Sequence, residues 1–357
     1  MSQMYPVSGV VPQAGVADGG RLERMADSGG SLARTNGATD ARVSEGSNVR
    51  ALTPGLRVVV ILGATATGKT ALALKVAESV GGEIINADSR YFYRGMDIGT
   101  AKPTVAEQMR VPHHLIDILE PTEPFSLGRF LTLVNGTVEE VAGRGHAPIV
   151  TGGTPQYLRA FLEGWRPPEV PPNEELRARL EDLSTEALCE RLIEKDPVSA
   201  GRIGRHNRRR MIRALEVSET LGRPMSEVSA SHAPPWRFLI IGLRSDRELL
   251  YERIDRRVEA MHAAGWLDEV VRLRDRGVTA ATPAMSAHGY RETLAVLDGT
   301  LQIGEAIRQT QTMVHAYVRH QETWFRRFVD VQWLDSSVDG FDDVAVRMTR
   351  EFLTERQ

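Results

Sequence analysis

The sequence has a single cysteine, Cys189, among its 357 residues. One thiol cannot form an intramolecular disulfide or a cysteine-built zinc site. Proteins that manage without disulfides are typical of reducing compartments, so we expect a cytoplasmic location. No stretch of the chain approaches the ~20 consecutive apolar residues of a membrane-spanning helix. We therefore expect no membrane partner.

The chain also lacks a strong charge of one sign. Its formal net charge is −3, from 44 Lys and Arg against 47 Asp and Glu. The whole molecule is no polycation, and any surface that binds nucleic acid must be a local patch. The 41% of hydrophobic residues is ordinary for a globular protein with a sizeable core. At ~100–200 residues per domain, the length predicts two domains, or one large domain with an insertion.

Residues 1–54 lack the periodic apolar residues of a folded segment and are rich in Gly, Ser, Ala and Asp. They contain no apolar core of a signal peptide, and their acidic residues argue against a transit peptide. We expect a disordered N-terminal tail. A start of translation further along, for example at Met25, explains the composition equally well.

From residue 57 on, the apolar pattern predicts an α/β fold. Residues 57–63 form a continuous apolar run typical of a buried parallel strand, and residues 83–89 and 147–153 predict two more. Helical patterns follow the first strand and cover residues 125–145, with Ser126 near the start. Strands that alternate with helices indicate a parallel sheet, and we assign 55–164 to the first part of a P-loop-type core.

Prolines, including Pro167 and Pro171, interrupt the pattern near residue 165. Helical patterns follow, with Asn173, Asp196 and Asn207 as N-caps, until a strand signal returns at 237–244. We predict an inserted all-helical domain at 165–236. The second part of the core then spans 237–340, with helices at 246–264, 266–276, 286–298 and 304–328. Residues 341–357 are expected to form a C-terminal helix or tail.

A glycine-rich motif follows the first strand. Gly63, Gly68, Lys69 and Thr70 satisfy the pattern G-x-x-x-x-G-K-[ST]. In such a loop the backbone N–H groups surround phosphate oxygens, the lysine adds charge, and the threonine hydroxyl can hold Mg²⁺. The N-terminus of the following helix attracts the same anion. The residues expected to bind phosphate are Gly63, Ala64, Thr65, Ala66, Thr67, Gly68, Lys69 and Thr70.

The acidic partner of this loop is not where an ordinary P-loop nucleotidase carries it. Such an enzyme needs an acid at the end of a second buried strand to orient Mg²⁺, but strand 147–153 ends in Thr151-Gly152-Gly153. The nearest acid at a strand end is Asp88, which closes 83–89. Ligands of open α/β sheets bind at strand ends, so we predict that Asp88 acts on a group beside the phosphates. A turn-capping or Mg²⁺-holding acid is the alternative.

Arginines stand out at two places. Arg257 falls within an apolar helical stripe formed by Leu250, Ile254 and Met261. An inward arginine needs an anion, and the alternatives are a structural salt bridge or a snorkelling side chain.

Residues 201–213 carry six arginines and no acid. Three of them occupy the first turn of a helix, where the dipole disfavours cations by ~0.3–1 kcal/mol each. This placement suits a nucleic-acid backbone. A solvated face paired with nearby glutamates is the alternative.

Three longer segments resemble the bacterial tRNA dimethylallyltransferases, also called tRNA isopentenyltransferases. They are GATATGKT continuing to EIINADSRYFYRGMDIGTAKPT, then VPHHLIDILEP, then PIVTGGTPQYLRAFLEG. RRRMIRALEV, GRPMSEV, SAHGYRE and HQETWFRR also agree, so the resemblance covers about residues 57–335. GMDIGTAKP beside a P-loop is highly specific for this family.

The resemblance implies an enzyme that moves the dimethylallyl group of dimethylallyl diphosphate to N6 of an adenosine in the anticodon stem-loop of tRNA, just 3′ of the anticodon. The sequence does not fix the oligomeric state, and we expect a monomer. The P-loop would hold the diphosphate with Mg²⁺. Asp88 matches the family's general base, Thr154 the residue at the leaving oxygen, and Arg257 an arginine that binds the diphosphate. The matched tRNA-binding residues are Asp88, Ser89, Arg90, Tyr91, Thr154, Arg177, Arg209, Arg210, Met211, Ile212, Arg213, Ser286, Ala287, His288, Gly289, Tyr290 and Arg291.

The sequence departs from the family pattern at a few positions. Ala64 and Thr67 replace a proline and a serine of the usual loop, and Tyr91 stands where many members have glutamine. The usual Lys-Arg-Gln near the C-terminus appears as Arg319-His320-Gln321. A histidine is mostly neutral at pH 7, which weakens a phosphate contact expected there.

Three other functions share parts of these patterns. A small-molecule P-loop kinase needs the acid that strand 147–153 lacks. An isopentenyltransferase for free adenine nucleotides needs neither the insertion nor SAHGYRE. A non-enzymatic RNA-binding module does not need Lys69, Thr70, Asp88 and Thr154 together.

Overall fold

The computed structural model describes residues 52–228 and 230–355, which belong to one compact unit. Residues 1–51 of the predicted tail lie outside the described residues. The last residues of that prediction contact the folded part: Leu52 packs against the main hydrophobic cluster, and the backbone N–H and the hydroxyl of Thr53 donate to Glu139 at 2.7 and 2.6 Å. In the described part of the chain, no helix combines the length and apolarity needed to cross a membrane.

The core is a six-stranded sheet with the order β3-β2-β4-β1-β7-β8, in which every pairing is parallel. Val60 of the central strand β1 pairs with Val150 of β4 on one side and Ile240 of β7 on the other. The predicted parallel α/β fold is thereby confirmed. The strands are β1 (Arg57–Gly63), β2 (Gly82–Asn86), β3 (His113–His114), β4 (Ala147–Gly152), β7 (Arg237–Arg244) and β8 (Val331–Asp335).

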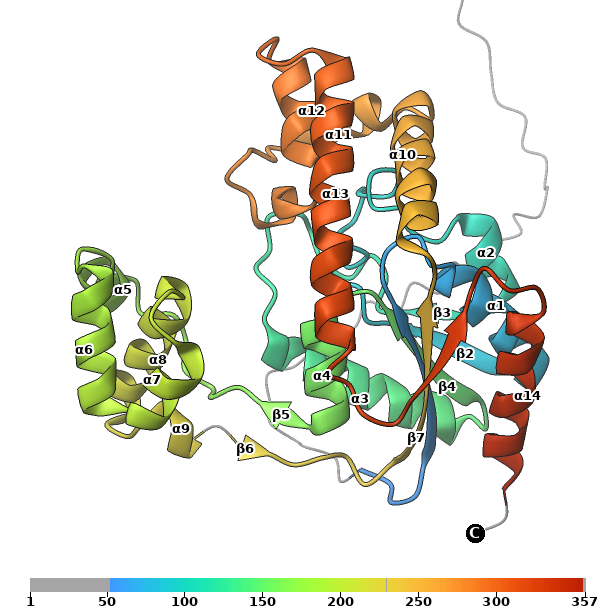
Figure 1. The fold of residues 1–357 in the computed structure, drawn as a ribbon, viewed down its shortest axis with the longest axis horizontal. Helices are drawn as coiled ribbons and strands as arrows, with labels where there is room; N and C mark the ends of the chain where they lie inside the picture. The colour runs from blue at the N-terminus through green and yellow to red at the C-terminus, as the bar shows by residue number, and fades with distance from the viewer. Residues whose placement is uncertain (1–51, 229, 356–357) are drawn as a thin grey trace, which may run out of the picture. The chain divides into compact units, whose positions relative to one another are not determined.

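Helices cover both faces of the sheet (Figure 1), because β1 is apolar on both. Val59 and Ile61 share a hydrophobic cluster with α1 (Lys69–Val80) and α14 (Phe341–Thr354). On the other face, Val58, Val60 and Leu62 share a cluster with α3 (Leu127–Gly143) and α4 (Pro155–Glu163). The segment predicted as a C-terminal helix or tail is thus a core helix through residue 354. The short helix α2 spans Val105–Arg110.

Two predicted elements have different bounds. Strand β2 ends at Asn86, short of the predicted residue 89, because the Asn86 side chain accepts from the Asp88 backbone N–H at 2.8 Å and turns the chain. The helix predicted over 286–298 begins only at Tyr290, because Gly289 has φ of 87° and the preceding residues form a short 3-10 helix. The pattern missed β8, a short edge strand.

Four α-helices and a 3-10 helix lie between β7 and β8 in the sequence, and α10 to α12 stand beyond the upper ends of the strands in Figure 1, with α10 packed against α13. These elements are α10 (Arg247–Ala263), α11 (Trp266–Asp275), the 3-10 helix η1 (Pro283–Ser286), α12 (Tyr290–Leu297) and α13 (Ile303–Phe325). The bounds of α10, α11 and α13 agree closely with the predicted helices.

The segment after α4 contains five helices that share a hydrophobic cluster of their own. The predicted caps Asn173, Asp196 and Asn207 are confirmed, since each side chain accepts a backbone N–H of the following turn. The segment is not all-helical, because β5 (Trp165–Arg166) and β6 (Ala230–Ser231) form an antiparallel pair at its two ends. The helices are α5 (Glu174–Glu181), α6 (Thr185–Lys195), α7 (Pro197–Ile203), α8 (Arg208–Leu221) and α9 (Met225–Val228).

A buried carboxylate, Glu216, holds this helical segment together. Its side chain is fully buried and accepts from the Asn173 N–H at 2.8 Å, from Arg177 at 2.9 Å and from Arg213 at 2.6 Å. Burial alone would raise the pKa of Glu216, but the Asn173 N–H and the two guanidinium groups outweigh it and hold the pKa below its usual value. Glu216 is therefore charged at neutral pH and joins α5 to α8.

We expect Glu216→Gln to destabilise the helical segment by about 2 kcal/mol at pH 7, somewhat less than a fully buried pair, because both arginines keep partial contact with water. The lowered pKa means that this stabilisation is present above the usual glutamate pKa and disappears as the pH falls through the lowered one. The melting temperatures of the wild type and Glu216→Gln should therefore differ at pH 7 and become similar in acid. Glu181→Gln, at an exposed pair with Arg208, is the matched control and should change little.

Candidate active site

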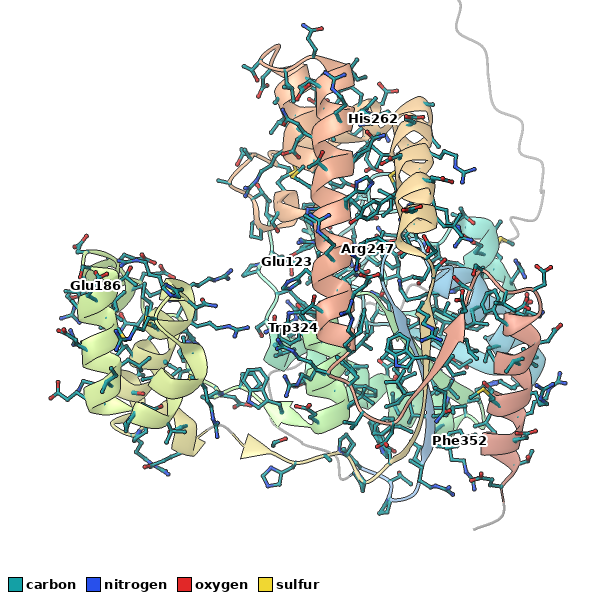
Figure 2. All side chains as sticks on the ribbon, in the orientation of Figure 1. Glu123, Glu186, Arg247, His262, Trp324 and Phe352 are labelled. Carbon is teal, nitrogen blue, oxygen red and sulfur yellow. The ribbon has the colours of Figure 1, made fainter. Side chains whose placement is uncertain are left out.

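A cavity of about 930 Å³ opens where β1, β2 and β4 end. Its size is typical of a site for a small-molecule substrate. Its lining comes from the glycine-rich loop, from the segments after β2 and β4, and from helices α10 and α13. Arg247 of α10, labelled in Figure 2, forms an ion pair with Glu322 of α13 at 2.6 Å, which ties these two helices together.

The glycine-rich loop forms the phosphate end of this cavity. Gly68 has φ of 88°, a left-handed conformation that starts α1 and that side chains disfavour. The Lys69 ammonium lies in the loop, where it donates to the Ala64 carbonyl at 2.7 Å. Of the predicted phosphate-binding residues, those that line the cavity are Thr65, Ala66, Gly68, Lys69 and Thr70. Ala64 and Thr67 are buried behind them, and Gly63 ends β1.

The environment of Lys69 makes the cavity receptive to an anion. Burial lowers the pKa of Lys69 to about 8, Asp88 partly offsets that effect, and the positive charge of Arg257 adds to it. Burial disfavours the charged form of a lysine, and a negatively charged ligand beside it stabilises that form. The buried ammonium of Lys69 therefore favours binding of an anion in this cavity.

Asp88 lines the cavity next to the loop. Its Oδ1 accepts from the Arg90 N–H at 3.0 Å, so one oxygen caps a turn as the alternative interpretation expected. Oδ2 has no hydrogen-bond partner among the described residues, and a Cβ placed on Gly153 would lie 3.2 Å from Oδ2 and 3.7 Å from Lys69 Nζ. One oxygen thus orients the carboxylate, and the other is available to a ligand.

Arg257 also faces the cavity, as the apolar stripe predicted. It is half-buried, donates to the Thr100 carbonyl at 3.3 Å, and forms no ion pair among the described residues. The pattern missed Arg253, which lies one turn earlier on α10, lines the same cavity and donates to the Ala66 carbonyl at 3.5 Å. Arg253 and Arg257 are four residues apart, and residues at this spacing lie on the same face of a helix, so the sequence could have indicated Arg253 as well.

Thr154 lies beside the cavity rather than in its lining. It caps α4, its hydroxyl oxygen accepts from the Ser89 N–H at 3.0 Å, and its O–H donates to Ser89 Oγ at 3.3 Å. In this structure its visible effect is to hold the turn after Asp88. The role at a leaving oxygen stays a prediction.

The remaining wall of the cavity is a loop that a buried acid holds in place. Glu269 is only 2% exposed and accepts from the Asp97 and Ile98 N–H groups at 2.8 and 2.7 Å and from the Tyr290 hydroxyl at 2.6 Å. Lys102 pairs with Asp97 and Asp117 at 2.5 Å each. Sequence reasoning named neither Glu269 nor Lys102 as a site residue. Apolar side chains that line the cavity include Ile98 of this loop and Met261, Trp266 and Val314 of the helices.

The residues matched to tRNA contacts near the cavity have different positions. Arg90 lines the cavity and donates to Ser286 Oγ at 2.9 Å, and Ala287 and His288 line it too. Tyr91 is another lining residue, and burial raises its pKa to about 12. Tyr290 is fully buried with Gly289 beside it, and its hydroxyl donates to Glu269, so its side chain lies inside the core. The contact of this segment with tRNA stays a prediction. Arg291 is exposed.

The matched residues of the helical segment divide in the same way. Met211 and Ile212 belong to its hydrophobic core, so their side chains are buried inside the segment, and the contact of residues 209–213 with tRNA stays a prediction. Arg177 and Arg213 bind Glu216. Arg209 and Arg210 are exposed and form no ion pair in the described part of the chain. His320, at the departure from the family pattern, is exposed and does not line the cavity.

Comparisons with known proteins cover this whole region. The family model described as IPP transferase matches residues 91–328, and one described as Isopentenyl transferase matches residues 56–115. The tRNA dimethylallyltransferase of Thermomicrobium roseum is 50% identical over 303 residues, which are 84% of this chain and 92% of the relative. That of a Roseiflexus species is 46% identical over 300 residues, covering 83% of this chain and 98% of the relative.

Solved structures agree with the sequence comparison. The tRNA isopentenylpyrophosphate transferase of Bacillus halodurans is 37% identical, with a TM-score of 0.62 over 83% of this chain and 95% of that chain. A eukaryotic dimethylallyltransferase acting on tRNA is 26% identical, with a TM-score of 0.73 over 85% of this chain and 81% of that chain. The similarity therefore extends over the cavity and the helical segment.

The lowered pKa of Lys69 predicts how the cavity binds inorganic diphosphate. Lys69 is charged below about pH 8, so its contribution to affinity should fall about tenfold between pH 7 and pH 9. Titration calorimetry gives the affinities of the wild type and Lys69→Met for diphosphate at both pH values. Dividing the wild-type affinity by the variant's affinity cancels the titration of diphosphate itself. If this ratio of affinities is equal at pH 7 and pH 9, the prediction is contradicted.

Proposed function

The chain belongs to the IPP transferase family, and on that premise we propose that it is a tRNA dimethylallyltransferase. It transfers the dimethylallyl group of dimethylallyl diphosphate to N6 of the adenosine 3′ of the anticodon. The observation that supports this most is that Lys69, Arg253, Arg257 and Asp88 line one cavity, with Asp88 Oδ2 and Lys69 Nζ both close to Gly153. Because its substrate would be tRNA, we propose that the enzyme acts in the cytoplasm, and that it acts there as a monomer.

The cationic end of the cavity binds the diphosphate. Residues of the glycine-rich loop, Lys69 and Thr70 at the N-terminus of α1 all line this end of the cavity, where a helix N-terminus attracts an anion. Arg253 and Arg257 approach it from α10. As the bond from the diphosphate oxygen to the allylic carbon breaks, negative charge grows on the diphosphate, and these groups stabilise it without reorganising. The apolar wall accommodates the five-carbon group.

The oxygen donors at this end fit Mg²⁺. The described residues contain no cluster of three His, Cys, Asp or Glu that could hold a metal. Mg²⁺ instead commonly takes one or two protein oxygens and completes its octahedron with substrate phosphates and water. The Thr70 hydroxyl lines the cavity at the start of α1 and is the residue that would hold it. When bound, the ion would neutralise part of the diphosphate charge.

Asp88 serves the acceptor. The adenine amine is a poor nucleophile, and a carboxylate that takes its proton as the N–C bond forms contributes ~10²–10⁴-fold. The Arg90 N–H orients Oδ1 of Asp88, and Oδ2 is left to accept that proton. Thr154 supports this arrangement through the Ser89 backbone.

The structure speaks against the competing functions at specific positions. A kinase needs an acid where β4 ends, but a Cβ on Gly152 would lie 2.4 Å from the Ala87 carbonyl carbon, so no side chain fits there. An enzyme for free nucleotides has no use for the helical segment with its exposed Arg209 and Arg210.

Incubation with radiolabelled dimethylallyl diphosphate tests the proposal, with either tRNA or AMP as the acceptor. We expect label in tRNA alone. Label in AMP would instead identify an adenylate isopentenyltransferase, and label in neither acceptor would refute prenyl transfer.

Asp88→Ala should lower the rate of transfer by about 10²–10⁴-fold while tRNA affinity stays within about threefold, because a general base acts on the transition state. Single-turnover rates and filter binding measure the two quantities. Asp339→Ala, at an exposed aspartate, serves as the control. Near wild-type turnover of the Asp88 variant would remove this residue from the mechanism.

Exposed arginines of the helical segment should bind the tRNA backbone. Arg208 is bonded to Glu181, so Arg205, Arg209 and Arg210 are the better set to test. Changing all three to Gln should lower the slope of log affinity against log salt by roughly two to three units, since each phosphate contact contributes ~0.7–0.9.

Binding titrations at several salt concentrations measure this slope, and turnover at saturating tRNA should survive. The control is the double change of Arg347 and Arg350 to Gln on the exposed side of α14. If the triple variant keeps the wild-type slope, these arginines are solvent-exposed residues that make no contact with the tRNA backbone.

A further inference from the structure

A buried glutamine on α13 connects two loops of the cavity. Gln321 is 1% exposed. Its Oε1 accepts from the Thr65 N–H at 2.9 Å, and its Nε2 donates to the Gly153 carbonyl at 2.6 Å. Tyr317, one turn earlier on the same helix, donates to the same carbonyl at 3.3 Å.

In the proposed reaction, one of the two loops binds the diphosphate and the other lies beside Asp88, the proposed general base. Thr65 belongs to the glycine-rich loop that contains Lys69. Gly153 lies next to Asp88, since a Cβ there would be 3.0 Å from Gln321 Nε2 and 3.2 Å from Asp88 Oδ2. The amide of Gln321 therefore spans the distance between the phosphate-binding loop and the acid.

We propose that Gln321 is a positioning residue that sets the separation between the phosphate-binding loop and the Gly153–Asp88 side of the cavity. Its catalytic consequence rests on the proposed function, because only a reaction between a bound diphosphate ester and an amine beside Asp88 requires that separation. Small displacements of reacting groups are costly in rate.

Only a side chain with both a donor and an acceptor at this reach meets the two loops. A methionine has nearly the same length but offers neither, so the Thr65 N–H loses its partner and the Gly153 carbonyl keeps only the 3.3 Å hydrogen bond from Tyr317. A glutamate carboxylate accepts from Thr65 but faces the Gly153 carbonyl with a second acceptor. A protonated glutamic acid has one carbonyl oxygen and one O–H, and it reproduces both hydrogen bonds.

This chemistry yields a test that depends on pH. Single-turnover rates of transfer to tRNA are measured from pH 8 down to pH 5.5 for the wild type, Gln321→Glu and Gln321→Met. At pH 8 both variants should be at least about tenfold slower than the wild type, with tRNA affinity unchanged. As the pH falls, the ratio of the Gln321→Glu rate to the wild-type rate should rise, because burial and the negative charge of Asp88 favour the neutral carboxyl and outweigh the opposite effect of Lys69. The ratio for Gln321→Met should stay flat.

Gln309→Met is the matched control, since Gln309 is exposed on the same helix, and it should keep the wild-type rate. All rates are measured well below the melting temperature of each variant, so that a loss of stability alone does not change them. Variants with wild-type single-turnover rates at every pH, or a Gln321→Glu ratio that does not depend on pH, would overturn the positioning role.

Binding of inorganic diphosphate separates this inference from the proposed function. Gln321→Met should weaken that binding about tenfold by displacing the loop, whether or not the protein acts on tRNA. Absence of transfer by the wild type would refute the proposed function only. Unchanged diphosphate affinity of Gln321→Met would refute the positioning of the loop.

Discussion

The parallel hydrogen bonding of β1 to both of its neighbours is the constraint on which the site depends. Parallel strands place all their carboxyl ends at one edge of the sheet. The loop after β1, the turn after β2 and the glycines after β4 therefore meet, although they lie far apart in the sequence. The apolar residues of β1 are buried on both faces of the sheet, and both edges of the strand are paired, so no part of the strand between Val58 and Leu62 is open to water.

The cavity concentrates positive charge at a cost that an anionic ligand removes. Lys69, Arg253 and Arg257 line one end, and burial together with Arg257 outweighs the attraction of Asp88 for Lys69. The positive charges of such a site repel one another when no anion is bound, and a diphosphate relieves this repulsion. Prenyl transfer requires positive charge at this place, because negative charge grows on the diphosphate as it leaves. Rigid supports keep these groups in place, because Glu269 fixes the loop at Asp97 and Gln321 fixes the loop at Thr65.

The helical segment uses arginine for two purposes. Arg177 and Arg213 neutralise the buried Glu216, and these three residues join α5 to α8. Arg209 and Arg210 remain on the surface, near the start of α8, where the helix dipole alone would disfavour them. The segment thus has its own core and internal charge balance, and its uncompensated cations are available to a polyanion.

The sequence by itself determined those features that depend on near neighbours. The strand 57–63, the phosphate-binding loop, the N-caps at Asn173, Asp196 and Asn207, and the inward position of Arg257 all follow from local composition or from helical periodicity. Only the tertiary structure decided which partner each polar group found. Gln321 meets Thr65 from 256 positions away, and Tyr290, predicted at an RNA surface, is buried against Glu269. Periodicity tells which face of a helix is apolar, but a hydrogen bond between distant residues exists only once the sheet and its helices have packed.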